Sequence, residues 1–542
     1  MMTDTDEDAA LQDFDAVVVG AGLSGLYALH HLRELGFTAH VVEAGDGVGG
    51  TWYWNRYPGA RCDVPSMEYS YGFSPELEQE WDWTERYATQ PEILRYVNHV
   101  ADRFDLRKDI TFSTRVTSME YDEDDASWTV ATDTGEVVRA RFCIMATGCL
   151  SYPKYPEVPG RDRFEGESYH TSRWPHDGVD FTGRRVAVIG TGSSGVQSIP
   201  LIAEQAGDLT VFQRTPNFSY PAQNAALAPG VMEATKASYP ALRDAARDSR
   251  AGIPLDLPEH SALEVDDEVR RATYEKRWGL GTLFGVTAAF TDLLLDRAAN
   301  ETAAEFVRAK IRDVVDDPDV ADLLCPTDHP LGTKRPCLDT NYYATYNRPD
   351  VHLVDLRATP LVEITPKGLR TTECEYEFDT IVYATGFDAM TGALTHIDIR
   401  GVGGQSLEKK WEAGPRTYLG LAVAGFPNLF TITGPGSPSV LSNMILSIEQ
   451  HVDWIARCLQ YLDDHGLRSI EASEAAEDGW VEHVHQVGEF TLYPLANSWY
   501  MGANVEGKAR VFMPYIGGLP AYRERCDDVA AHGYEGFEVE TC

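Results

Sequence analysis

The chain has 542 residues, of which 43% are hydrophobic, and a formal net charge of −38. This length allows two or three domains with cores of their own, and the apolar content is ordinary for a globular protein. The strongly negative charge argues against nucleic acid and anionic membranes as partners. No run of about 18 apolar residues occurs, so a membrane span is not expected.

The acidic N-terminus, MMTDTDEDAA, lacks the basic start and apolar core of a signal peptide, so we expect a cytoplasmic protein whose residues 1–13 are disordered. The nine cysteines are scattered without a CxxC pair, which argues against a zinc site, a disulfide framework or a dithiol redox centre. Only 10 of the 46 basic residues are lysine. Acid-rich, lysine-poor surfaces are typical of halophilic proteins, whose self-repulsion concentrated cations screen, although an ordinary acidic enzyme is the alternative.

The chain begins its ordered part with a complete dinucleotide-binding fingerprint. An apolar strand is predicted over 14–19, and the turn GAGLSG follows at 20–25, before a helix over 26–35. A second strand over 38–42 leads to Glu43, which can accept hydrogen bonds from ribose hydroxyls but would repel a 2′-phosphate. The glycines let the backbone approach a pyrophosphate at the helix N-terminus. They are Gly20, Gly22 and Gly25.

A second fingerprint carries the opposite charge at the matching position. A buried strand is predicted over 185–189, followed by the turn GTGSSG and a further strand over 209–212. Arg214 then stands where Glu43 stands in the first fingerprint, and a cation there can pair with a 2′-phosphate. Thr215 can add a hydroxyl contact, so this unit is expected to prefer NADP over NAD. Its glycines are Gly190, Gly192 and Gly195.

The rest of the chain divides around these two units. The stretch FEGESYHTSRWP, residues 164–175, follows neither helical nor strand periodicity and is predicted to be a loop. Small-residue ATG turns at 146–148 and 384–386 suggest that the chain leaves the first unit and later returns to it. We therefore expect a first unit over 1–150 and 387–542, a second over 151–224 and 331–386, and a helical insertion over 225–330.

Three further stretches admit both a functional and a purely structural interpretation. Asp63, in the segment YPGARCD, is also typical of an ordinary turn cap, and Lys334 and Arg335 are also typical of surface charges. The turn GPGSPS leads into a predicted helix over 440–462. Its N-terminus would favour a reduced, anionic flavin, but a plain capped helix fits equally well.

The pattern F-x-G-x3-H-x3-W-P between two glycine turns resembles the signature of the type I Baeyer–Villiger monooxygenases, and the resemblance runs over nearly the whole chain. Its members are Phe164, Gly166, His170, Trp174 and Pro175. The Trp-Pro ending separates this family from the flavin-containing monooxygenases and N-hydroxylases, which share both glycine turns. The segments YPGARCD, KRPCLDTNYY, YATGFDAMTG, GPGSPSVLSNM and NSWYMGANVEGK are most similar to its phenylacetone monooxygenase branch.

The resemblance implies an α/β fold with two Rossmann-like domains, one for FAD and one for NADP, and a helical insertion in the NADP domain. It implies that NADPH and O2 convert a small-molecule ketone to an ester or lactone on non-covalently bound FAD, through a C4a-peroxyflavin and a tetrahedral (Criegee) adduct. Oxidation of amine or sulfide heteroatoms is the alternative, and a non-catalytic redox sensor is another. No metal, nucleic acid or membrane is implied, and we expect a monomer or a weak homo-oligomer.

The resemblance also implies roles for single residues. Arg335 corresponds to the active-site arginine above the flavin, Asp63 to the carboxylate that orients it, and His170 to a mobile hinge between the domains. The residues placed at the cofactors are Gly20, Gly22, Gly25, Glu43, Thr51, Trp52 and Asp63 for FAD, and Gly190, Gly192, Gly195, Arg214, Thr215, Lys334 and Trp499 for NADP. The residues placed around the ketone are Ser439, Val440, Leu441 and Met444.

Overall fold

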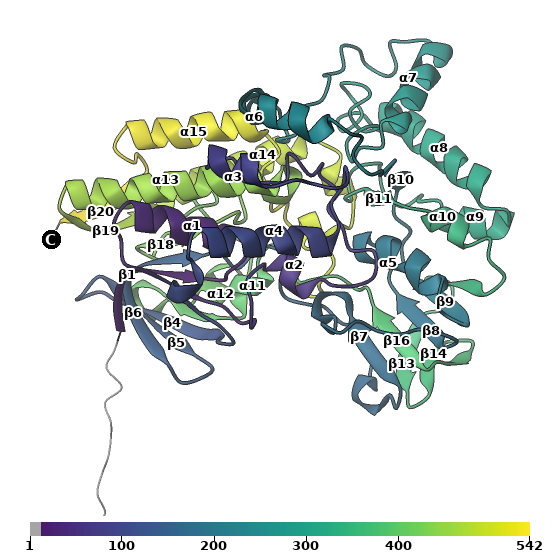
Figure 1. Ribbon diagram of the computed structural model, residues 1–542, viewed down its shortest axis with the longest axis horizontal. Coiled ribbons are helices and arrows are strands. Elements are labelled where there is room, and N and C mark those ends of the chain that lie inside the picture. The colour runs from purple at the N-terminus through teal and green to yellow at the C-terminus, as the bar shows by residue number, and fades with distance from the viewer. Residues whose placement is uncertain (1–11, 542) are drawn as a thin grey trace, which may run out of the picture.

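The computed structural model describes residues 12–541 as an α/β protein with one mixed sheet, at the left of Figure 1, and one parallel sheet, at its lower right. The predicted disorder of residues 1–11 lies outside the described residues. For Gln12 and Asp13 it is wrong, because both belong to strand β1 (Gln12–Val19) and Asp13 pairs with Arg139 at 2.7 Å. Within residues 12–541, no helix combines the length and the apolar character that crossing a membrane would need.

The first sheet is built around β1, which has parallel neighbours on both sides. Val18 lies beside Val41 of β2 (Ala39–Val42) and Ile144 of β6 (Val137–Met145). Both faces of β1 are also covered, which explains why this strand is a continuous apolar run. Ala16 and Val18 pack on the face covered by helices α1 (Leu23–Glu34) and α13 (Met444–Asp464), whereas Val17 and Val19 pack on the opposite face. The strand order is β3 (Ile110–Thr111), β2 (Ala39–Val42), β1, β6 (Val137–Met145), β5 (Ser127–Thr132), β4 (Val116–Asp122) and β17 (Asp398–Arg400), with β18 (Leu429–Thr431) also beside β6.

The second sheet carries the other glycine turn and an edge strand that the sequence does not predict. Its order is β12 (Val351–Asp355), β9 (Asp208–Gln213), β8 (Arg185–Ile189), β16 (Thr380–Tyr383) and β7 (Glu167–His170). Strand β7 lies inside the stretch 164–175, so the predicted loop is wrong there: His170 pairs in register with Tyr383. A short edge strand is buried on few sides, which leaves it without an apolar pattern.

The remaining strands form small sheets outside these two. Strands β13 (Leu361–Thr365), β14 (Gly368–Thr371) and β15 (Glu375–Glu377) are antiparallel and lie near the second sheet (Figure 1). Strand β10 (Ser219–Pro221) pairs with β11 (Cys337–Asp339), so the two ends of the intervening chain meet. Strand β19 (Leu467–Ala472) pairs with β20 (Phe537–Thr541) beside the C-terminus.

Helices cover the sheets and fill the 225–330 segment. Those near the first sheet are α1 (Leu23–Glu34), α2 (Thr51–Trp54), α3 (Pro75–Glu80), α4 (Gln90–Arg103), α11 (Gly392–Thr395), α12 (Leu407–Lys410), α13 (Met444–Asp464), α14 (Glu474–Glu489) and α15 (Leu519–Ala531). The 225–330 segment forms α6 (Val231–Asp248), α7 (Asp267–Gly279), α8 (Arg297–Val314) and α9 (Pro318–Leu324). The second sheet has α5 (Ser193–Ala203), and α10 (Tyr342–Thr345) lies beyond it (Figure 1).

Helix α13 begins four residues later than predicted. Ser439 to Leu441 form a separate 3₁₀ turn, after which Ser442 is fully extended. Asn443 then caps α13, because its side-chain oxygen accepts a hydrogen bond from Ile445 N at 3.1 Å. The turn GPGSPS therefore does not run into the helix N-terminus.

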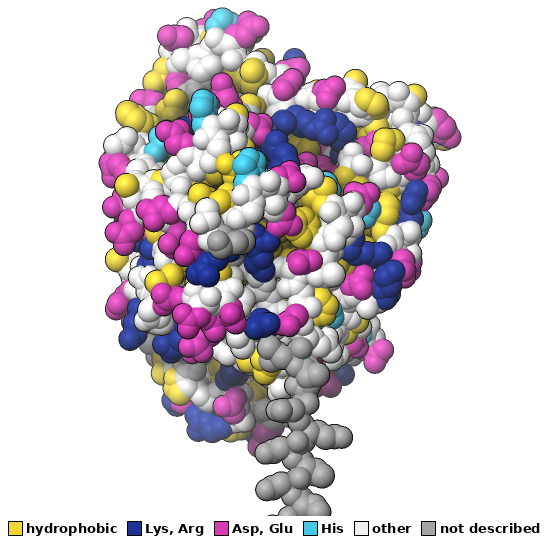
Figure 2. All heavy atoms as spheres, turned by 90° about the vertical axis from the view of Figure 1, so that its left-hand side faces the viewer, with side chains coloured by type: hydrophobic (Ala, Val, Ile, Leu, Met, Phe, Trp, Pro, Cys, Tyr) yellow, Lys and Arg dark blue, Asp and Glu magenta, His cyan; other side chains and the backbone are white. Residues whose placement is uncertain are grey.

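Acidic side chains are spread over the face shown in Figure 2, with arginine and lysine between them. Many of these charges form ion pairs, such as Arg185 with Asp379 at 2.8 Å and Arg457 with Asp527 at 2.9 Å. Exposed pairs of this kind contribute little each, so the excess of acid remains a net repulsion that salt can screen.

Candidate active site

Arg335 and Asp63 form a two-pronged ion pair, although 272 residues separate them in the chain. Arg335 Nε donates to Asp63 Oδ2 and Nη2 donates to Oδ1, each at 2.9 Å. Arg335 stands just before β11, and Asp63 lies in the loop after α2. This parallel fork fixes the plane of the guanidinium, so neither residue is the turn cap or the free surface charge that the sequence also allowed.

The third contact of Arg335 reaches the segment predicted to line the ketone pocket. Arg335 Nη1 donates to the carbonyl oxygen of Val440 at 2.8 Å. Burial opposes the guanidinium charge, but the Asp63 carboxylate and Tyr500 outweigh burial and hold the pKa of Arg335 above its ordinary value. Arg335 is therefore a permanent cation in a largely enclosed place.

Tyr500 is a neighbour of Arg335 that sequence reasoning missed. Its side chain is buried beside the guanidinium, and burial raises the pKa of Tyr500 to about 12, against the opposing effect of Arg335. The motif NSWYMGANVEGK contains this residue, but the family resemblance assigns a role only to its neighbour Trp499. Its hydroxyl is protonated at neutral pH.

The first glycine turn leaves no room for side chains. A Cβ on Gly25 would lie 1.8 Å from Gly20 O, and one on Gly20, whose φ is +105°, would lie 2.7 Å from Ala146 O of the ATG turn. Gly22 meets Gly50 so closely that its Cβ would be 3.3 Å from Gly50 Cα. This bare backbone at the start of α1 fits a pyrophosphate.

Glu43 lies at the end of β2 and faces the same turn. It is 5% exposed, and its two oxygens accept hydrogen bonds from Ala21 N and Gly45 N, each at 2.7 Å. Burial raises the pKa of Glu43, and these two backbone donors oppose that rise. Each carboxylate oxygen keeps a second lone pair, so Glu43 fits the ribose hydroxyls of FAD.

Thr51 and Trp52 begin helix α2, which follows Gly50 directly. Thr51 is exposed, whereas Trp52 is 7% exposed and its Nε1 donates to the hydroxyl of Tyr69 at 3.2 Å. The two residues thus lie beside the first glycine turn, on the side of the Asp63 loop.

The second glycine turn repeats the geometry of the first. A Cβ on Gly190, whose φ is +110°, would lie 2.4 Å from Ala384 O, and one on Gly195 would lie 2.3 Å from Gly190 O. Gly192 meets no atom within 4 Å, so the surface in front of this residue is open. The start of α5 therefore fits a second pyrophosphate.

Two cations gather beyond this turn. Arg214 is exposed, while Lys334 is half-buried. Burial and then the nearby charges of Arg214 and Arg357 lower the pKa of Lys334, against the opposing charge of Asp328. A phosphate would relieve this repulsion, so the cluster fits the 2′-phosphate of NADP. Thr215 adjoins it, and its carbonyl accepts a hydrogen bond from the Thr191 hydroxyl at 3.1 Å.

His170 ends strand β7 and is buried and neutral. Its Nδ1 accepts from Ser172 N at 3.1 Å, so Nε2 carries the proton and donates to Lys154 O at 3.1 Å. Burial lowers the pKa of His170 to about 4. Both ring nitrogens are thus occupied by neighbouring chain, which leaves His170 unsuited to proton transfer.

The other members of the F-x-G-x3-H-x3-W-P pattern pack rather than react. Gly166 leaves no room for a Cβ, which would lie 2.6 Å from both Asp379 O and the ring of Phe164. Trp174 is 4% exposed and packs against Phe181, while Pro175 lines a surface cavity of about 700 Å³ beside α4.

The residues predicted at the ketone share one apolar cluster with Trp499, which is predicted to contact NADP. Val440, Leu441, Met444 and Trp499 all belong to it, together with Tyr500. Ser439 is fully buried beside them, and its hydroxyl donates to Thr433 O at 2.9 Å. Ser439 therefore holds the backbone of this turn.

Comparison with known proteins identifies relatives over the whole length. A family model described as pyridine nucleotide-disulphide oxidoreductase matches residues 17–239. A Baeyer-Villiger monooxygenase of Pseudooceanicola batsensis is 41% identical, with 96% of this chain and 95% of the relative covered. An oxidized steroid monooxygenase bound to NADP has a TM-score of 0.93 at 56% identity, covering 98% of this chain and all of the other. OTEMO in complex with FAD and NADP has a TM-score of 0.94 at 44% identity, covering 97% and 99%.

Proposed function

The chain belongs to the Baeyer–Villiger monooxygenases, and we propose that Arg335, held by Asp63, is the residue on which its oxidation of ketones depends. The protein is a flavoprotein that uses FAD, NADPH and O2 to convert ketones to esters or lactones. Oxidation of amines or sulfides is not favoured, because relatives named for ketones, such as a cyclohexanone 1,2-monooxygenase and a cyclopentanone 1,2-monooxygenase, outnumber the one named for nitrogen, a phenazine N-monooxygenase of 42% identity. The single observation that carries the proposal is the two-pronged Asp63–Arg335 pair.

Arg335 is suited to hold an anion at the reacting centre. Asp63 and the Val440 carbonyl accept hydrogen bonds from three of its five N–H groups. Even with Tyr500 as acceptor for a fourth, one N–H group remains to donate to an anion. FAD, when bound, supplies the reduction of O2 and the transfer of one oxygen atom. A guanidinium that never loses its proton stabilises the negative charge that develops on the ketone oxygen, as an oxyanion hole does. Asp63 keeps that donor in place.

We propose that the two glycine turns hold the two cofactors. Glu43 and the first turn would bind FAD in a domain formed by 1–150 and 387–542. The second turn would bind NADP in a domain formed by 151–224 and 331–386, with 225–330 as its helical insertion. Arg214, Thr215 and Lys334 would hold the 2′-phosphate, and the support is their shared cation cluster.

The hinge and the pocket follow from the same contacts. His170 forms hydrogen bonds to Ser172 and Lys154 through its two ring nitrogens. We propose that it couples the second sheet to the segment around Lys154, next to the proposed domain boundary at residue 150. Trp499 would close over NADP, and Val440, Leu441 and Met444 would line the ketone site; their common apolar cluster supports this and would exclude water.

We also propose that the enzyme works in the cytoplasm of a salt-rich cell, as a monomer or weak homo-oligomer, without nucleic acid or membrane partners. The net charge of −38 and the spread of acidic side chains in Figure 2 support this setting.

A ketone panel tests the function. The holoenzyme is incubated with NADPH and linear, cyclic, aryl and steroid ketones at low and high salt, and the products are identified by mass spectrometry. We expect NADPH consumption matched by an ester or lactone 16 mass units heavier than at least one ketone. NADPH oxidation that yields only hydrogen peroxide with every ketone would contradict the proposal.

A further inference from the structure

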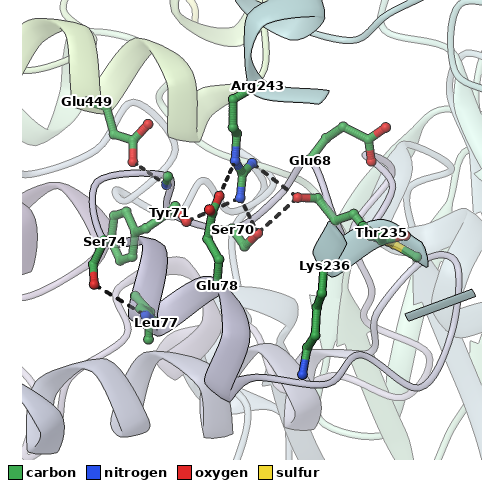
Figure 3. A network of polar contacts seen from close by, with 12 residues as sticks. Glu68, Ser70, Tyr71, Ser74, Leu77, Glu78, Thr235, Lys236, Arg243 and Glu449 are labelled. Atoms are coloured by element: carbon green, nitrogen blue, oxygen red, sulfur yellow. Dashed lines mark hydrogen bonds and ion pairs between the residues drawn. The ribbon is translucent and has the colours of Figure 1, made fainter. Parts of the chain in front are cut away.

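Arg243 of helix α6 is a buried cation that the proposed mechanism does not use. Its side chain is 4% exposed, and its Nε donates to the equally buried Glu78 of α3 at 2.8 Å. The same guanidinium donates to Met67 O at 3.1 Å, to Ser70 Oγ at 2.8 Å and to Tyr71 O at 3.2 Å. Figure 3 shows Arg243 entering the loop between Glu78 and Ser70. One residue of the 225–330 segment thus holds several groups of the 67–72 segment.

Glu449 of α13 holds the other end of the 67–72 segment. Its carboxylate accepts a hydrogen bond from Gly72 N at 2.6 Å, and it is 8% exposed (Figure 3). Burial raises the pKa of Glu449 to about 7, and the charge of Arg243 opposes that rise. The 67–72 segment is therefore held between two helices, α6 and α13, by buried polar groups.

From this segment a short chain of hydrogen bonds leads to the candidate active site. Asn443, which is fully buried, donates through its side chain to Glu68 O at 2.7 Å, and its backbone N donates to Ala251 O at 2.7 Å. Asn443 closes the 439–444 turn, and Val440 of that turn accepts from Arg335. Displacement of residues 67–72 would therefore move the carbonyl that Arg335 bonds.

We propose that Arg243 is a positioning residue for the ketone site: through residues 67–72 and Asn443 it fixes the 439–444 turn against Arg335. The inference rests on the proposed function of Arg335 and of that turn. Arg243 touches neither cofactor nor ketone in this role, since it acts through the loop. It makes the shape of the pocket depend on where the 225–330 segment lies.

Stability alone is a weak reason for this arrangement. A buried ion pair rarely stabilises a fold more than apolar residues of similar volume would, because both ions lose their hydration. The fork of Arg243 instead gives three directed hydrogen bonds to residues 67–72 and a fourth to Glu78, which specifies geometry. The effect of a mutation should therefore appear in selectivity more than in folding.

The test compares Arg243→Lys with a matched control, Arg308→Lys. Lysine keeps the charge beside Glu78 but cannot make the forked contacts. Arg308 is also a buried arginine of the 225–330 segment, bonded to Glu305 and to Pro326 O, and has no contact with residues 67–72. The readouts are the ratio of the two ester regioisomers from an unsymmetrical ketone and the KM for that ketone. The isomer ratio does not depend on how much enzyme is folded.

We expect Arg243→Lys to bind FAD and to be reduced by NADPH within two-fold of the wild-type rate. Its isomer ratio should change at least three-fold and its ketone KM rise at least five-fold, while Arg308→Lys keeps both within two-fold. If Arg243→Lys does not fold, Glu78→Gln serves in its place and should change the isomer ratio by a smaller factor. An unchanged ratio in the variants that fold, or an equal shift in Arg308→Lys, would overturn the inference. A wild-type enzyme that forms no ester would instead refute the proposed function.

Discussion

The two glycine turns of this protein have the same backbone and opposite charges beyond it. Gly20 and Gly190 both have positive φ, and a Cβ on either would collide with an alanine carbonyl of an ATG turn, Ala146 or Ala384. The difference lies at the end of the second strand of each unit. Glu43 is buried and bonded by two backbone N–H groups, whereas Arg214 is exposed beside Lys334. We propose that the same backbone turn serves both pyrophosphates and that the charge of this one side chain selects the dinucleotide.

Among substitutions at the two turns, removal of Glu43 should cause the largest loss of cofactor binding. Glu43→Ala leaves Ala21 N and Gly45 N without their acceptor and removes the acceptor proposed for the ribose. Hydrogen bonds to a charged group contribute about 1.5–3 kcal/mol each, so FAD affinity should fall about 100-fold or more. Titration of the apoprotein with FAD measures it. Wild-type affinity in this variant would remove Glu43 from the cofactor site.

Arg214 should matter less, and only for one cofactor. Arg214→Ala loses a charge-assisted contact to the 2′-phosphate, so kcat/KM for NADPH should fall about 10- to 100-fold. The value for NADH, which has no such phosphate, should change by about two-fold at most. Parallel steady-state assays give both numbers. An equal loss with the two cofactors would place the 2′-phosphate elsewhere.

Lys334 should give the smallest effect of the three. Lys334→Met keeps the length of the side chain, relieves its repulsion with Arg214 and Arg357, and loses one charge for the phosphate. These opposing changes predict a fall of about 5- to 10-fold in kcat/KM for NADPH. Arg357→Met, whose side chain is paired with Asp355 at 3.2 Å, is the matched control. A larger loss for Arg357→Met would show that Arg357, not Lys334, faces the phosphate.

Much of the fold could be predicted because it depends on local pattern. The apolar runs that became β1 and β8, and the glycines after them, follow from two-sided burial and from close backbone approach. Strand β7 escaped prediction because its order comes from pairing with β16, about 210 residues away. The start of α13 escaped because the cap is Asn443, whereas an equally good turn signal stands at residues 434–439.

The candidate site was less accessible from the sequence. Neither Asp63 nor Arg335 was marked by spacing, since 272 residues separate them, and only the family resemblance linked them. Tyr500 and Arg243 were missed because their significance lies in contacts across distant segments. A sequence pattern reports neighbours along a helix or strand, and these residues act between elements.

We propose that Arg335 serves oxygen transfer and not hydride transfer. Its most direct test is Arg335→Ala, studied in two steps with the same holoenzyme: anaerobic flavin reduction by NADPH, followed by product analysis after O2 and ketone are added. We predict reduction within about ten-fold of the wild-type rate and loss of ester by about 1000-fold, as for removal of an oxyanion donor. Ester formed at the wild-type rate would contradict the claim.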